Sequence, residues 1–237
     1  MKPMWKDRSI LYCFSPPVML VTMLIEGVLF IYTILRYRMT RFGRGAALTL
    51  LLLAAFQLSE YQICARSTHA LLWARAGFVA ITFLPVLGLY LVSLVNKKTH
   101  FLRLGYVLLL FYVPYFLIAP RAIQGAYCGG NYVIFNTAQA WYVFYGFYYF
   151  GFLLLAMWDA SVQMYKDRLR FKNKKTVLFW FLIGYTSFLL PMGIVFLLSP
   201  SILGAVPSVM CGFAVFFALI LVLKVLPSYV RAHEENR

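Results

Sequence analysis

Charged residues are scarce in this sequence. Asp, Glu, Lys and Arg together make up 12% of the 237 residues, whereas apolar residues make up 63%. Soluble domains are about 25% charged and about half apolar, so the composition excludes an ordinary soluble domain. The 22 basic residues outnumber the 7 acidic ones and give a net charge of +15. Because the basic residues flank apolar runs and form no polar domain of their own, we do not expect nucleic-acid binding.

The sequence also lacks the usual signatures of catalysis and of bound cofactors. It contains no phosphate loop, nucleophile elbow or zinc-protease motif, so the sequence indicates no particular enzyme class and favours a non-catalytic protein, with a membrane enzyme kept as an alternative. The three histidines, His69, His100 and His233, lie outside the apolar runs and leave a haem between helices without ligands. Lys224 lies at the edge of the last apolar run. A retinal Schiff base, which needs a lysine at mid-depth, is therefore not expected either.

Seven apolar runs follow one another along the chain. Each meets the length of a membrane-spanning helix, about 20 residues, although the fourth is marginal. No small-residue cleavage site accompanies the first run, so we treat it as a spanning helix. The sequence predicts a single all-α integral membrane domain over residues 1–237, a bundle of seven transmembrane helices at about 17–35, 45–65, 71–95, 101–119, 138–158, 176–198 and 203–226.

The third run, Leu71–Leu94, is the stretch around which we expect the bundle to be organised. It is long and apolar, yet it contains Arg75 about one turn from its start and Pro85 near mid-depth. An ionisable residue in hydrocarbon is costly and marks a paired or functional site. Pro85, like Pro191 in the sixth run, frees a helix carbonyl and is a candidate pivot.

The positions of the basic residues predict the orientation of the bundle. Sixteen Lys and Arg residues fall in the first, third and fifth loops and the tail, whereas five fall on the opposite side. By the positive-inside rule the amino terminus is outside and the carboxyl terminus is cytoplasmic. The long exterior segment from Pro120 to Thr137 is expected to be a loop with turns at its glycines.

A polar pocket is predicted near the outer ends of the second and third helices. Glu60 and Arg75 both lie roughly 6–8 Å below the surface at 1.5 Å rise per residue, so we expect them to meet as an ion pair. Glu26 is deeper, and is either neutral or an alternative partner of Arg75. The predicted ligand-binding residues are Glu60, Arg75, Trp73, Gln57, Glu26 and Thr82.

The four cysteines, Cys13, Cys64, Cys128 and Cys211, fall on the predicted exterior half, where disulfides are permitted. One bridge between Cys64 and Cys128 is the simplest interpretation, and free buried thiols are the alternative. A copper or zinc site made by Cys64, His69, Cys128 and Cys211 has suitable soft ligands but no supporting spacing motif.

Two short motifs are similar to known families. Leu72-Trp73-Ala74-Arg75, followed by Pro85, resembles the third helix of the seven-helix amino-terminal sensor region of bacterial histidine kinases. Cys13-Phe14-Ser15 and Gln57-Leu58-Ser59-Glu60 resemble small free-standing bacterial seven-helix proteins that begin Met-Cys-Phe-Ser. Asn131 stands where the second group is expected to have a histidine. The resemblance implies a sensor-type fold in a bacterial inner membrane.

Three functions are compatible with these features. The first is a membrane sensor or receptor that binds a small apolar ligand between helices and signals through a cytoplasmic partner or a second copy. The second is a transporter or channel that uses Glu26 and Glu60 as proton or cation sites. The third is a membrane thiol or metal protein that works through the outer cysteines.

Overall fold

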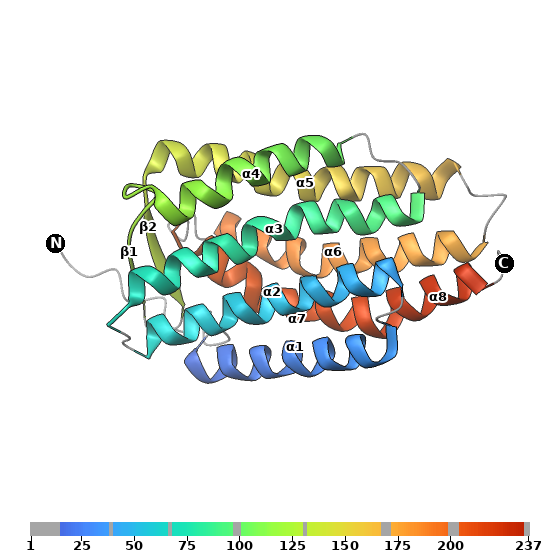
Figure 1. Cartoon of the computed structure of the whole chain (residues 1–237), viewed down its shortest axis with the longest axis horizontal. Coiled ribbons are helices and arrows are strands. Elements are labelled where there is room, and N and C mark those ends of the chain that lie inside the picture. Colours follow the sequence, from blue (N-terminus) through green and yellow to red (C-terminus); the bar gives the residue numbers. More distant parts are fainter. Residues whose placement is uncertain are drawn as a thin grey trace.

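The computed structural model describes residues 15–37, 40–65, 68–96, 101–129, 132–166, 172–198 and 204–234, without the side chains of residues 139–142 and of 172 and 173. Cys13, Arg66 and Asn131 lie outside these ranges, as do the loop residues Lys97, Lys98, Arg168 and Arg170. The described part consists of long helices running along one axis, with a small hairpin at one end (Figure 1). Its helices are α1 (Pro16–Tyr37), α2 (Arg41–Cys64), α3 (Ala70–Asn96), α4 (Leu102–Ile118), α5 (Gln139–Lys166), α6 (Lys172–Leu198), α7 (Val206–Ile220), the π-helical turn η3 (Leu221–Val225) and α8 (Leu226–Glu234).

Six of these helical stretches are long and apolar enough to cross a membrane, namely α1, α2, α3, α5, α6 and the continuous α7–η3–α8. The helix α4 is also apolar but has only 17 residues. Large side chains such as Val107, Leu110 and Ile118 of α4 are exposed. Soluble proteins rarely expose such continuous apolar surface, so the fold fits an integral membrane protein in contact with lipid.

The structure is compatible with an all-α membrane bundle, but the segment expected to be an exterior loop folds as a β-hairpin. Strand β1 (Ile123–Cys128) pairs antiparallel with β2 (Val133–Thr137). The register shifts between Ile123 and Gly125, and the Gly129 N–H closes the hairpin by donating to the Tyr132 carbonyl at 2.8 Å. Alternation of buried and exposed residues in β2 places Val133 and Phe135 in the interior.

Helix α3 is the most buried of the six candidate spans. In its most apolar stretch 72% of the residues are interior, against 22% for α1. Close approach of α2 depends on Gly77, where an added Cβ would lie 3.2 Å from Phe56 and from Ser59. The prediction that this segment organises the bundle is consistent with its central place between α2, α4 and α5 (Figure 1).

Local sequence explains several helix ends. The Thr40 hydroxyl caps α2 by accepting a hydrogen bond of 2.8 Å from the Gly43 N–H. The last helix continues to Glu234, further than predicted, and widens into a π-turn directly before Pro227. Proline has no N–H and cannot donate a hydrogen bond to the preceding turn. Irregular helical geometry such as a π-turn is common at such positions.

Candidate functional site

Two carboxyl side chains are buried in the part of the bundle where α1, α2 and α7 meet. Glu26 of α1 is fully buried, and Glu60 of α2 is 1% exposed. The two carboxyls interact electrostatically, and the Ser208 hydroxyl of α7 bonds to Glu60. Neither oxygen of Glu26 has a hydrogen-bond partner within the described residues, and the same holds for Oε1 of Glu60 and Nε2 of the buried Gln57. We call Glu26, Glu60, Gln57 and Ser208 the acid cluster.

The β-hairpin is attached to this acid cluster. The N–H of Val133 in β2 donates to the Ser208 hydroxyl at 3.2 Å, in a buried position. A void of about 10 Å³ lies between Gln57, Glu60 and Ser208, bordered by Thr22 of α1. A space of this size admits about one water molecule. The cluster is therefore closed off beneath the hairpin and is not a wide aqueous pocket.

The predicted ion pair between Glu60 and Arg75 is wrong. Arg75 donates to the main-chain carbonyl of Leu117 at 2.9 Å and to that of Ala119 at 3.5 Å, at the end of α4. Two residues at a similar predicted depth meet only if their side chains also face one another around the helix axes. Gly77 faces α2, and Arg75 is about 200° away from it on a helix of 3.6 residues per turn.

The acid cluster consequently has no cationic partner among the described residues. Ionising both Glu26 and Glu60 would place two negative charges in an apolar interior without compensation, which is strongly unfavourable. The chemistry that such a pair supports is the binding and release of a proton.

A separate apolar cavity of about 430 Å³ lies between α3, α5, α6 and α7. Its size falls within the range of about 300–1,000 Å³ that is typical of small-molecule sites. Its wall is almost entirely apolar, and the lining residues that carry a polar group are Tyr145, Tyr149 and Cys211. The lining residues are Ile81, Val143, Tyr145, Gly146, Tyr149, Phe150, Leu154, Leu189, Met192, Gly193, Phe196, Val206, Pro207, Met210 and Cys211. We call this space the apolar cavity.

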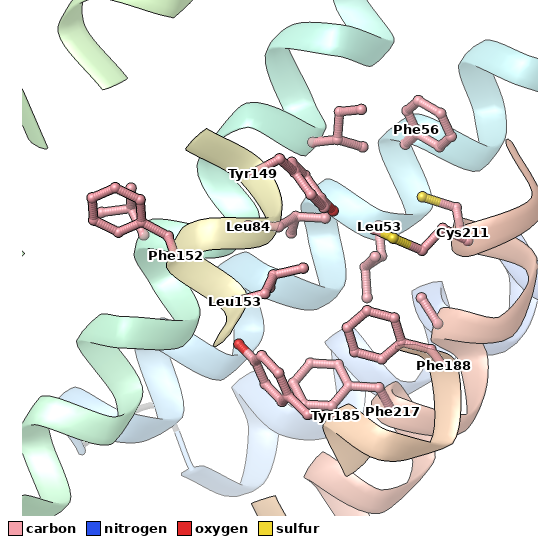
Figure 2. Close-up of a cluster of buried hydrophobic side chains, with 14 of the residues drawn as sticks. Leu53, Phe56, Leu84, Tyr149, Phe152, Leu153, Tyr185, Phe188, Cys211 and Phe217 are labelled. Atoms are coloured by element: carbon pink, nitrogen blue, oxygen red, sulfur yellow. The ribbon is translucent and has the colours of Figure 1, made fainter. Parts of the chain in front are cut away.

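Cys211 lies between the apolar cavity and the acid cluster. It lines the cavity, it is 2% exposed, and it interacts electrostatically with Glu60 and Glu26. Figure 2 shows its sulfur directed into the core that Leu53, Leu84 and Tyr149 also enter. A molecule in the cavity would thus be separated from the carboxyls by the side chains of one turn of α7.

Two tyrosines of α5 bind α3 next to Pro85, and one of them, Tyr145, also lines the cavity. The Tyr145 hydroxyl lies 3.1 Å from the Thr82 hydroxyl, and the Tyr148 hydroxyl donates to the Thr82 carbonyl at 2.7 Å. Pro85 leaves the neighbouring carbonyl of Ile81 without its helical donor. Polar contacts from α5 therefore concentrate where α3 is least supported by its own hydrogen bonds.

The six residues predicted to bind a ligand do not form one site. Glu26, Gln57 and Glu60 belong to the acid cluster, and Arg75 binds the end of α4. Trp73 is half-buried and packs against the core at the start of α3. Thr82 holds Tyr145 but does not itself line the apolar cavity.

The predicted disulfide between Cys64 and Cys128 is confirmed: it ties the end of α2 to β1. The predicted metal set is wrong, because two of its thiols are in this bond and Cys211 is a buried free thiol in α7. His69 lies in the turn before α3, where its carbonyl accepts from the Trp73 N–H at 3.1 Å. Within the described residues no three His, Cys, Asp or Glu side chains are placed to hold a metal ion.

Sequence reasoning missed Ser208, the tyrosines of α5 and the cavity itself. Gly146 and Gly193 line the cavity, and a Cβ added at either would meet no atom within 4 Å. Glycines inside two aromatic helices were a usable signal for such a space, but periodicity alone does not show which helix faces meet. No protein-family model matches the sequence, and no curated protein matches it.

Proposed function

We propose that the protein is a membrane sensor that binds a small apolar molecule in the apolar cavity. The observation that carries the proposal is this cavity of about 430 Å³, which has an almost entirely apolar wall and lies between four helices. Apolar pockets with a few oriented polar groups are the usual form of small-molecule sites. The hydroxyls of Tyr145 and Tyr149 and the Cys211 thiol would supply those polar groups.

The contacts around Pro85 support a way for the ligand to change the bundle. A ligand signals only if it binds two helix arrangements unequally. Ile81 and Tyr145 both line the cavity, and Tyr145 also contacts Thr82 beside Pro85. A molecule that shifts Tyr145 would therefore alter the support of α3 at its proline, with Pro191 of α6 as the second pivot.

The proposal places the protein in a bacterial inner membrane as a seven-helix bundle, with α4 as the seventh span. The hairpin and the amino terminus would lie outside, and Glu234 would lie on the cytoplasmic side. The positions of Lys and Arg support this orientation. A cytoplasmic partner or a second copy would receive the change in helix arrangement.

Native mass spectrometry of gently extracted protein tests the ligand directly. We expect a discrete apolar adduct of small-molecule mass on the polypeptide, which organic extraction would then release for identification. A spectrum showing only the polypeptide and heterogeneous lipid would contradict the proposal.

A second function, proton or cation movement through the bundle, is favoured by the acid cluster. Its two carboxyls are buried and have no cation beside them in the described part of the chain. Proteoliposomes with an imposed pH gradient would show proton flux that Glu26→Gln or Glu60→Gln abolishes, whereas Glu234→Gln at the end of α8 would retain it. Equal flux in all variants and in protein-free vesicles would exclude this function.

A further inference from the structure

A third cavity lies at the opposite end of the bundle from the hairpin, between α2, α3 and α4. Its volume is about 570 Å³ and it is open to the surroundings. Arg41 and Arg44 of α2, Tyr90 of α3 and Tyr106 of α4 surround its polar end. We call this space the arginine groove.

The arginine groove changes character along its length. Leu48 is seven residues from Arg41 along α2, and Phe83 is seven residues from Tyr90 along α3, which at 1.5 Å per residue places both about 10 Å further into the bundle. Val86, Leu87 and Leu109 complete this inner part. The groove thus has a cationic, phenolic end at the helix termini and an apolar end toward mid-membrane.

The arginines at the polar end carry uncompensated charge. Arg41 and Arg44 are exposed, and no hydrogen bond or ion pair joins either to a carboxylate within the described residues. Arg41 interacts electrostatically with the phenol of Tyr229, which belongs to α8. Both arginines also lie in the first turn of α2, where the helix dipole is positive and favours an anion.

A glycine allows the floor of the groove to form. At Gly45, an added Cβ would lie 3.0 Å from Leu91 and 3.2 Å from the Tyr90 ring. The helices α2 and α3 therefore approach closely directly below the arginines. This contact holds the Tyr90 ring beside the first turn of α2, at Gly45, which follows Arg44 in the sequence.

We propose that the arginine groove binds an anionic phospholipid. The lipid phosphate would lie between Arg41 and Arg44, and one acyl chain would follow the apolar wall past Leu48 and Phe83. Arginine is well suited to phosphate because its planar guanidinium donates two parallel hydrogen bonds. Basic pockets between transmembrane helices bind such headgroups, and tyrosines are common at the same depth.

The experiment is native mass spectrometry of the full chain in detergent, titrated with phosphatidylglycerol or with phosphatidylcholine of the same chains. We expect selective retention of phosphatidylglycerol. The double variant Arg41→Gln, Arg44→Gln should weaken it about 30-fold, since each arginine contributes about 1 kcal/mol near an anionic lipid and 1.4 kcal/mol is tenfold. Circular dichroism would confirm that the variant, altered only at exposed positions, is folded.

Two controls separate the groove from general electrostatic attraction. Arg231→Gln removes an exposed arginine of α8 that does not line the groove, and it should retain phosphatidylglycerol as the wild type does. Equal loss in Arg231→Gln, or no loss in the double variant, would overturn the proposal. Glycerol 3-phosphate that binds as tightly as the lipid would show a site for a free phosphate, and would also overturn it.

Discussion

The Tyr148 hydroxyl donates a buried hydrogen bond of 2.7 Å to the main-chain carbonyl of Thr82. The bond joins α5 to α3 three residues before Pro85, and the Thr82 side chain meets Tyr145 at the same level. The contact of Tyr145, which lines the apolar cavity, therefore links the cavity wall to α3 beside its proline. It is the structural basis for expecting that occupancy of the cavity changes how α3 is held.

Removing the bond between Tyr148 and Thr82 should destabilise the bundle without creating a large cavity in its core. Tyr148→Phe removes a buried hydrogen bond, at a cost of about 0.5–1.5 kcal/mol. Thermal unfolding in detergent should show a lower Tm than the wild type. Tyr165→Phe provides the matched control on α5, because Tyr165 is 76% exposed; equal Tm values for the two variants would contradict the assigned role of Tyr148.

A double-mutant cycle should show that Glu60 and Arg75 act independently. Arg75→Gln removes bonds to the end of α4, whereas Glu60→Gln alters the acid cluster. Substitutions without shared partners add to within about 0.3–0.5 kcal/mol, whereas contacting residues couple by about 0.5–3 kcal/mol. The measurement is the free energy of unfolding of both single variants and the double variant. A coupling energy above about 1 kcal/mol would show that Glu60 and Arg75 interact directly, and would contradict their assignment to separate neighbours.

The disulfide should stabilise the hairpin end of the bundle. Replacing Cys64 and Cys128 together by serine is expected to cost about 2–4 kcal/mol, because the bond closes a long loop in the unfolded chain. Reductant should lower the Tm of the wild type and leave that of the double variant unchanged. Cys211→Ala is the control, since Cys211 is a free thiol. A non-reduced digest in which Cys64 and Cys128 peptides run separately would refute the bond.

Two helix glycines should respond in opposite ways to alanine. A Cβ at Gly88 of α3 would collide with the Tyr185 hydroxyl of α6, whereas one at Gly27 of α1 would meet nothing within 4 Å. Gly88→Ala should therefore destabilise by about 1–3 kcal/mol through overpacking. Gly27→Ala should be neutral or stabilising by up to about 1 kcal/mol, through helix propensity. Denaturation curves of the two variants that coincide would contradict this packing of α3 against α6.

The membrane class, the helices and the disulfide were predictable from sequence because each follows from a local or one-dimensional signal. Length and hydropathy predicted seven spans, and six helices of the structure are long and apolar enough to be such spans. The position of Cys64 and Cys128 on the predicted exterior half suggested their bridge. The hairpin was missed because glycines at 125, 129 and 130 were interpreted as turns of a loop, although Val133 and Phe135 alternate as a half-buried strand does.

The site could be predicted only in part, because depth along a helix is easier to derive than direction around it. Glu60 and Arg75 were predicted at a similar depth, but they face different neighbours. The acid cluster required knowledge that α1 and α7 meet at Glu60, and the apolar cavity required the packing of α3, α5, α6 and α7. Neither relationship follows from the spacing of residues within one helix.

The most direct test of the sensor proposal compares cavity-filling variants by native mass spectrometry. Gly193→Leu and Gly146→Leu place side chains in the apolar cavity, where a new Cβ meets no atom. Gly151→Leu adds the same side chain in equally open space on α5, but away from the cavity lining. We predict that the apolar adduct of the wild type is lost from the first two variants and kept by Gly151→Leu. An adduct that persists in all three variants would contradict the assignment of the cavity as the ligand site.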